Sequence, residues 1–169
     1  MFRLRFPERD IGDWAARFPS SDSDARLGEI RPRVLARGHL TRAEFLTLCS
    51  WKSPRSKPRC RENSEHQVRT LTRAALGASD EALKIDLLRL LRGVEWPTAS
   101  TLLHFCDTRP YPILDYRALW SLGYVKPPCY TMKFWLAYLD YTRRLATRLG
   151  LSIRDVDKAL WQYSKEKQG

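Results

Sequence analysis

The sequence predicts an all-α protein, and three observations lead to that prediction. Apolar residues recur at helical spacing through most of the chain, capping residues precede these segments, and glycine or proline follows many of them. No segment shows the alternation of apolar and polar residues that marks a half-buried strand. The 169 residues fit a single helical domain, which we expect to span residues 1–169 with its helices packed around residues 83–123.

Caps and apolar faces define the helices of the first half of the chain. Thr41, with Glu44 three residues later, has the pattern of a capping box, and Ser64 and Ser79 precede two further apolar segments as N-caps. The polar stretch 19–24 predicts a turn. The predicted helices are 11–18, 25–37, 41–51, 64–76 and 80–91, the last with an apolar face made of Leu83, Leu87, Leu88, Leu90 and Leu91.

A basic, proline-containing segment at 52–61 is predicted to be a loop. It contains no acid, and its cationic side chains are Lys52, Arg55, Lys57, Arg59 and Arg61. Cations beside an aromatic residue, here Trp51, suit a nucleic-acid backbone, so these five are DNA-binding candidates. The alternative is a merely solvated loop, and Trp51 itself is expected in the core.

A tight turn between two helices is predicted at residues 91–99. Gly93 and Pro97 interrupt a leucine-rich helical pattern, and Thr98 is the predicted N-cap of the apolar helix that follows. The pattern therefore predicts a helix-hairpin-helix.

A second joint is predicted at residues 110–115. Pro110 and Pro112 stiffen the chain and remove backbone donors, and Asp115 stands directly before an apolar helix at 116–122. A carboxylate at that position can cap the helix, take part in catalysis, or do both.

The last third of the chain contains two predicted helices. The first, 132–149, brings aromatic residues and arginines together. Ser152 and Asp155 then cap a helix that runs to about Lys165, with Val156, Leu160 and Trp161 facing inward.

The charge balance predicts a polyanionic partner. Thirty Lys and Arg oppose 19 Asp and Glu, which gives a formal charge of +11. There is no apolar run near twenty residues and no apolar core of a secretory signal, so we expect no membrane span and a cytoplasmic location. The cysteines at 49, 60, 106 and 129 lack metal-ligand spacing, so neither a metal nor a cofactor is expected.

Residues 91–122 resemble the helix-hairpin-helix (HhH-GPD) DNA glycosylase superfamily, which includes endonuclease III and the adenine glycosylase MutY. The family hairpin is L-P-G-V-G-x-x-T-A, and the matching positions are Leu91, Gly93, Val94, Thr98 and Ala99. The family's catalytic aspartate follows the hairpin's last glycine position by twenty residues, and here 115 − 95 = 20. The resemblance implies a compact member of this superfamily.

The resemblance also implies the roles of individual residues in base excision from damaged or modified double-stranded DNA, by a protein that we expect to be a monomer. Asp115 would stabilise the cationic sugar and position water. Aromatic base-pocket candidates are Tyr111, Tyr116 and Trp120. DNA-binding candidates beside the basic loop are Gly93, Val94, Trp96, Thr98 and Arg117.

Three departures from the family pattern bear on this expectation. Glu95 replaces the second glycine, and its charge would repel a phosphate. Pro97 stands where bifunctional members carry a Schiff-base lysine, so no lyase activity is expected. The iron–sulfur loop of endonuclease III is missing. Two functions therefore stay open: a monofunctional DNA N-glycosylase, or a non-catalytic helix-hairpin-helix protein that binds nucleic acid or another partner.

Overall fold

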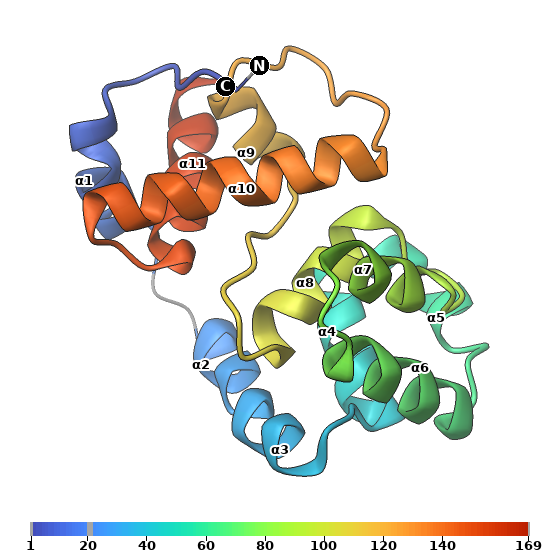
Figure 1. Cartoon of the computed structure of the whole chain (residues 1–169). Coiled ribbons are helices and arrows are strands. Elements are labelled where there is room, and N and C mark those ends of the chain that lie inside the picture. The colour runs from blue at the N-terminus through green and yellow to red at the C-terminus, as the bar shows by residue number, and fades with distance from the viewer. Residues whose placement is uncertain (1, 20–21, 169) are drawn as a thin grey trace. The chain divides into compact units, whose positions relative to one another are not determined.

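The computed structural model describes residues 2–19 and 22–168, and all regular structure within them is helical (Figure 1). The predicted all-α class is confirmed. Ser20 and Ser21 of the predicted turn lie outside the described residues, and the turn predicted at residues 22–24 is wrong, because α2 begins at Asp22. Among the residues described, no helix is long and apolar enough to cross a membrane.

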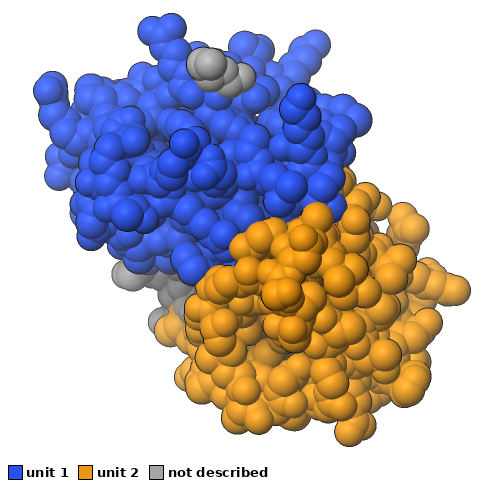
Figure 2. Space-filling view, viewed as in Figure 1, with its two compact units in different colours: residues 1–20, 110–169 blue, residues 21–109 orange. Residues whose placement is uncertain are grey.

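The chain divides into two compact units, coloured separately in Figure 2. Unit 1 combines residues 1–20 with residues 110–169, and unit 2 is the continuous segment 21–109. The single domain over residues 1–169 stays a prediction.

Unit 2 is built around α8, which contacts α3, α4 and α7. Nearly every residue of α8 is buried, because small and apolar side chains occupy all of its faces. The helices of this unit are α2 (Asp22–Gly28), α3 (Ile30–Arg37), α4 (Arg42–Lys52), the 3-10 turn η2 (Pro54–Ser56), α5 (Lys57–Cys60), α6 (Glu65–Gly77), α7 (Glu81–Arg89) and α8 (Trp96–Cys106).

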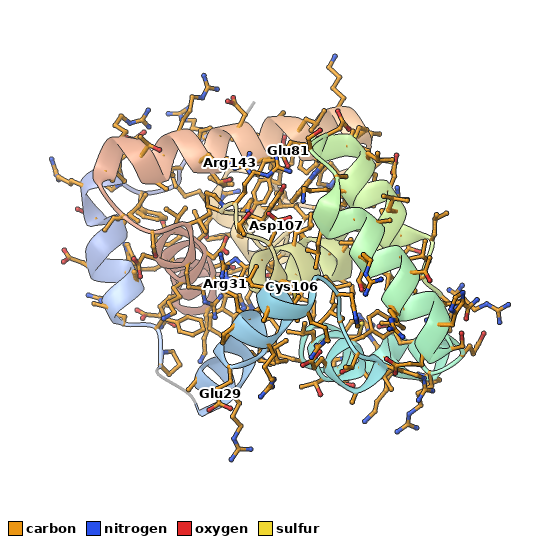
Figure 3. The ribbon with its side chains drawn as sticks, turned by 60° about the horizontal axis from the view of Figure 1, so that its bottom comes forward. Glu29, Arg31, Glu81, Cys106, Asp107 and Arg143 are labelled. Atoms are coloured by element: carbon orange, nitrogen blue, oxygen red, sulfur yellow. The ribbon has the colours of Figure 1, made fainter. Side chains whose placement is uncertain are left out.

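A buried ion pair fixes the end of α8 within unit 2. The Lys84 ammonium donates to the Asp107 carboxylate and, at 2.8 Å, to the carbonyl of Leu76. Asp107 also accepts the backbone N–H of Arg109 at 2.9 Å, and Arg109 reaches Glu81 at 3.1 Å; Figure 3 labels Glu81 and Asp107. Because both buried charges have partners, neither is left uncompensated in the core.

Unit 1 is organised around α11, which contacts α1, α9 and α10. Its N-terminal segment is held to the end of α9 by backbone hydrogen bonds from Arg3 to Leu122 (3.0 Å) and from Arg5 to Ser121 (2.9 Å). The helices of this unit are the 3-10 turn η1 (Glu8–Asp10), α1 (Ile11–Ala16), α9 (Tyr116–Ser121), α10 (Met132–Leu149) and α11 (Ile153–Lys167).

The capping box predicted at Thr41 and the N-caps predicted at Ser64 and Ser152 are confirmed, and both serines also form capping boxes. Three boundary predictions are wrong. The helix expected at 25–37 is two helices, α2 and α3. The loop expected at 52–61 is largely helical, as η2 and α5. The cap of α7 is Asp80, which accepts from the Leu83 N–H at 2.7 Å, and not Ser79.

The predicted apolar face of α7 is also partly wrong. Leu83 and Leu90 are 50% and 67% exposed, while Lys84 and Ile85 take the buried face together with Leu88. Apolar periodicity could not predict this face, because a lysine is normally expected at the surface. Here the Asp107 carboxylate pairs with the buried Lys84 ammonium.

Candidate functional site

The hairpin of unit 2 depends on close packing at Gly93. This residue has a φ of +79°, a left-handed conformation that favours glycine. A Cβ at this position would lie 2.8 Å from both the backbone nitrogen and the Sγ of Cys60, in α5. The hairpin therefore rests directly on the basic segment that precedes it in the chain.

Asn63 joins the same two segments by hydrogen bonds. Its side-chain amide donates to the carbonyls of Cys60 and Arg92, both at 2.9 Å, and its Oδ1 accepts the N–H of Arg92 at 2.8 Å. Asn63 is buried, so these bonds are shielded from water. Sequence reasoning missed this residue, because an asparagine directly before a helix cap carries no signal of a partner 29 positions away.

The hairpin candidates differ in accessibility. Val94, Trp96 and Thr98 are buried, and the Arg89 guanidinium lies 4.0 Å from the centre of the Trp96 ring. The predicted N-cap at Thr98 is wrong, because α8 begins at Trp96 and Glu95 is its N-cap residue. The side chains of three of the predicted hairpin candidates are therefore enclosed in the protein.

The basic segment keeps its charges at the surface of unit 2. Arg55, Arg59 and Arg61 are exposed, and Lys52 and Lys57 are half-buried. Trp51, expected in the core, is half-buried, with its ring 5.5 Å from that of Phe105 in a T-shaped contact. Of the five DNA-binding candidates, the three arginines are therefore the ones with exposed side chains.

Asp115, in unit 1, is the N-cap of α9. Its backbone is extended, and its Oδ1 accepts the Arg117 N–H at 2.8 Å. The side chain is half-buried. Burial, and after it the negative charge of Asp115, raises the pKa of Tyr130. Asp115 is therefore a partly shielded carboxylate with phenol groups in its surroundings.

Buried side chains hold the extended segment that leads to Asp115. The Ile113 N–H donates to the Asp157 carboxylate at 3.0 Å, and the Tyr138 hydroxyl donates to the Ile113 carbonyl at 3.1 Å. Both partners of Ile113 are buried, on α11 and α10. This clamp of Asp157 and Tyr138 fixes the backbone two residues before Asp115.

Arg143 supports the same segment from α10. Its Nε donates to the Pro110 carbonyl at 2.8 Å, and its guanidinium lies 4.8 Å from the centre of the Tyr111 ring; Figure 3 labels Arg143. Sequence reasoning missed Asp157, Tyr138 and Arg143 as site residues. Only Asp157 carried a signal, since it lies one position after Val156 and three before Leu160, both predicted to face inward.

The three base-pocket candidates have three different surroundings. Tyr111 is fully buried and stacks on Trp135 with ring centres 6.5 Å apart. Tyr116 is 51% exposed. Trp120 is half-buried, and the Arg5 guanidinium lies 4.5 Å from its ring centre. Of the three, only Tyr116 offers a largely open side chain.

Unit 1 also contains a cavity of about 580 Å³ with aromatic walls and a charged rim. Phe2, Tyr124, Phe134 and Tyr141 form the walls. The rim carries Lys133, Asp140 and Arg144, of which the last two form an ion pair. Asp115 lies outside the lining of this cavity.

Within the described part of the chain, no group of three or more His, Cys, Asp or Glu side chains is placed to hold a metal ion. Cys49, Cys60 and Cys106 are buried free thiols, and Cys129 is exposed. Comparison of the chain with protein-family models, curated proteins and solved structures gives no match.

Proposed function

We propose that the protein is a monofunctional DNA glycosylase of the helix-hairpin-helix type, in which Asp115 is the catalytic carboxylate. The observation that carries the proposal is the clamp that holds the segment before Asp115. Two buried polar side chains fix both backbone groups of Ile113, and the carboxylate that follows is half-buried and caps α9. The clamp and the cap together hold the Asp115 carboxylate at the start of α9, where it is partly shielded from water.

The chemistry of base release fits this carboxylate. Cleavage of the N-glycosidic bond builds positive charge on the sugar, and a fixed negative charge stabilises that transition state more than the ground state. Asp115 would also orient the attacking water or accept its proton. Because Asp115 is already held by its bond from the Arg117 N–H, little reorganisation is needed during the reaction.

The DNA-binding part of the proposal is supported by the charge of +11 and by the exposed arginines of the basic segment. Changing Lys52, Arg55 and Arg59 together to Ala should lower the log–log salt slope of duplex binding by up to about 2.7, since each lost phosphate contact contributes about 0.9. An unchanged slope would remove this segment from the interface.

Asp115→Asn tests the catalytic assignment, and Asp80→Asn is its matched control. Both aspartates cap a helix, and asparagine retains most of the capping bond, so each variant should lose no more than about 1 kcal/mol of unfolding free energy. Only Asp115→Asn should slow base release, by about 100-fold or more. The substrates are duplexes carrying single alkylated, oxidised or deaminated bases.

The proline at position 97 allows a prediction of the reaction product. Without a lysine at this position the reaction should stop at an abasic site, and borohydride should trap no protein–DNA adduct. Equal rates for wild type and Asp115→Asn would refute the role of Asp115, and a trapped adduct would refute the monofunctional assignment.

A non-catalytic helix-hairpin-helix protein that binds nucleic acid or another partner is the second candidate, and Glu95 favours it. This residue is exposed at the start of α8, makes no side-chain capping bond, and places a negative charge on the hairpin. Duplex binding by the wild type without release of any base in the panel would favour this function. Glu95→Gln should then tighten duplex binding, because it removes a charge that repels phosphate.

A further inference from the structure

One face of α11 carries a stripe of cations that the proposed function does not use. Arg154, Lys158, Trp161 and Lys165 are spaced by four, three and four positions, which places them on one side of the helix. Val156 and Leu160, on other faces of the same helix, are buried. We call the four residues the α11 stripe; Lys165 is exposed and the other three are half-buried.

Two aromatic rings lie among these cations. Phe18 and Trp161 pack edge to face with ring centres 5.3 Å apart. The Arg154 guanidinium lies 5.5 Å from the Phe18 ring and the Lys158 ammonium 5.7 Å from it, while the Lys165 ammonium lies 5.1 Å from the Trp161 ring. All three distances fall within the range of a cation–π contact.

These contacts decide what the stripe is suited to bind. Because the cations themselves lie over the ring faces, the rings hold the cations in place and are poorly placed to stack on nucleobases. A held cation loses less conformational entropy when it binds an anion. The stripe therefore matches a row of phosphates better than a row of bases.

Three carboxylates of α11 have partners outside the stripe. Asp155 accepts from the hydroxyl of the Ser152 cap at 2.6 Å, Asp157 accepts from the Ile113 N–H, and Glu166 pairs with Arg17 at 3.2 Å. Each of these contacts ties an acid of α11 to a group that is not one of the stripe's cations. These three contacts place the acids of α11 at its cap and in its packing.

The stripe is continuous with the helix that follows Asp115. The Arg117 guanidinium of α9 lies 5.6 Å from the Trp161 ring, and the Arg117 N–H is the group that Asp115 caps. From Arg154 to Lys165 the helix rises about 16 Å, at about 1.5 Å per residue. One DNA strand presents a phosphate about every 3.4 Å along the duplex axis, so three cations over this length can contact about three phosphates of one strand.

We propose that the α11 stripe binds the sugar–phosphate backbone of duplex DNA, along the strand that carries the target nucleotide. Only the choice of that strand rests on the proposed function. Phosphate contact itself requires the stripe and the distances above, and not base excision.

Salt titration of binding to an undamaged duplex tests the proposal. Lys158→Gln with Lys165→Gln should lower the log–log salt slope by about 1.8, and Lys165→Gln alone by about 0.9. The matched controls are Lys126→Gln and Lys133→Gln, which remove the same charge from positions off the stripe and should leave the slope unchanged. Thermal unfolding verifies that each variant is folded, and the exposed Lys165 carries the test if the double variant is not.

Equal slopes for stripe and control variants overturn the proposal. The proposal is also overturned if the stripe variants bind phosphatidylserine vesicles more weakly than wild type but bind duplex DNA equally well. That outcome would assign the surface to anionic lipid. If the stripe variants lower the slope but the wild type releases no base, the stripe stands and the proposed catalytic function fails. Base release with equal slopes supports the catalytic function and removes the stripe from the DNA interface.

Discussion

Two joints bracket α8, and different kinds of contact hold them. The joint before it turns at Gly93, where backbone and Sγ of Cys60 fill the space that a side chain would need. The joint after it runs extended through Ile113, where the buried groups of Asp157 and Tyr138 satisfy the backbone. The first joint therefore has no room for a side chain at position 93. The second joint depends on the polar side chains that bond to Ile113. Different substitutions should break each one.

The largest effect is expected at the first joint. Gly93→Ala combines a left-handed backbone with a Cβ 2.8 Å from a backbone atom, and should lower the unfolding free energy by about 2–5 kcal/mol. Gly150→Ala is the matched control, since Gly150 has a φ of +64° and open space around it. It should lose only about 1–2 kcal/mol in the same denaturant titration. Similar losses of unfolding free energy in the two variants would show that Cys60 can move to make room for the added Cβ.

Asn63→Ala should have the next largest effect. It leaves both backbone groups of Arg92 without their side-chain partner, which should cost about 2–3 kcal/mol. The Cys60 carbonyl still accepts the backbone N–H of residue 63 at 3.3 Å. Asn63→Asp retains an acceptor for the Arg92 N–H but loses the donors. Asn63→Asp should be at least as unstable as Asn63→Ala at neutral pH, because a buried carboxylate oxygen would face the carbonyls of Cys60 and Arg92. A Tm of Asn63→Ala equal to that of wild type would contradict the bridging role.

Substitutions at the second joint should lower the unfolding free energy less, but they should disturb the position of the backbone before Asp115. Asp157→Ala leaves the Ile113 N–H buried without its acceptor, at about 1–2 kcal/mol, and Tyr138→Phe removes one hydrogen bond, at about 1 kcal/mol. Amide exchange of Ile113 should accelerate in Asp157→Ala and recover in Asp157→Asn, which retains an oxygen. If the proposed function holds, base release should slow at unchanged duplex affinity. Unaltered exchange would show that Asp157 does not hold this backbone.

The smallest expected effect concerns the ionisation of the Cys60 thiol, at the first joint. A hydrogen bond with Cys49 lowers the pKa of the Cys60 thiol from 9.0 to about 7; the Ser56 hydroxyl and the Arg59 charge add to this, and burial opposes it. The folded protein therefore releases this proton at a lower pH than the unfolded chain. The stability that this group contributes rises between about pH 7 and 9, and is lost as the pH falls through 7.

Cys49→Ala should raise the pKa of Cys60 towards 9.0 and flatten the dependence of stability on pH in that window. Thiolate ultraviolet absorbance reports the ionisation, and unfolding at several pH values reports the linkage. Cys106→Ala is the control, because Cys106 is not among the groups that shift the Cys60 pKa. An ionisation step near pH 7 that persists in Cys49→Ala would assign the lowered pKa to another cause.

The contacts that the sequence could predict are those between residues close together in the chain. The caps at Thr41, Ser64 and Ser152 are contacts between residues three apart, so the residue pattern contains both partners. The predicted cap at Thr98 is wrong, because Pro97 is tolerated in the first turn of a helix and therefore does not mark its boundary.

The support of Asp115 lies beyond such patterns. Asp115 and its capping role are predictable from position, and its bond to the Arg117 N–H confirms the cap. Asp157, however, lies 44 residues from Ile113 in the chain, and Tyr138 lies 25 residues away. Nothing in either segment identifies the other, because these pairings arise only when α10 and α11 pack in unit 1.

The division of the chain has a consequence for the order of folding during synthesis. Unit 2 is one continuous stretch, so it can complete its contacts while residues beyond 109 are still being added. The N-terminal segment must wait longer, since Arg3 and Arg5 bond to Leu122 and Ser121, more than a hundred residues later. The segment that contains Arg3 and Arg5 is thus made long before its partners, and the long loop that it closes makes unit 1 the slower unit to form.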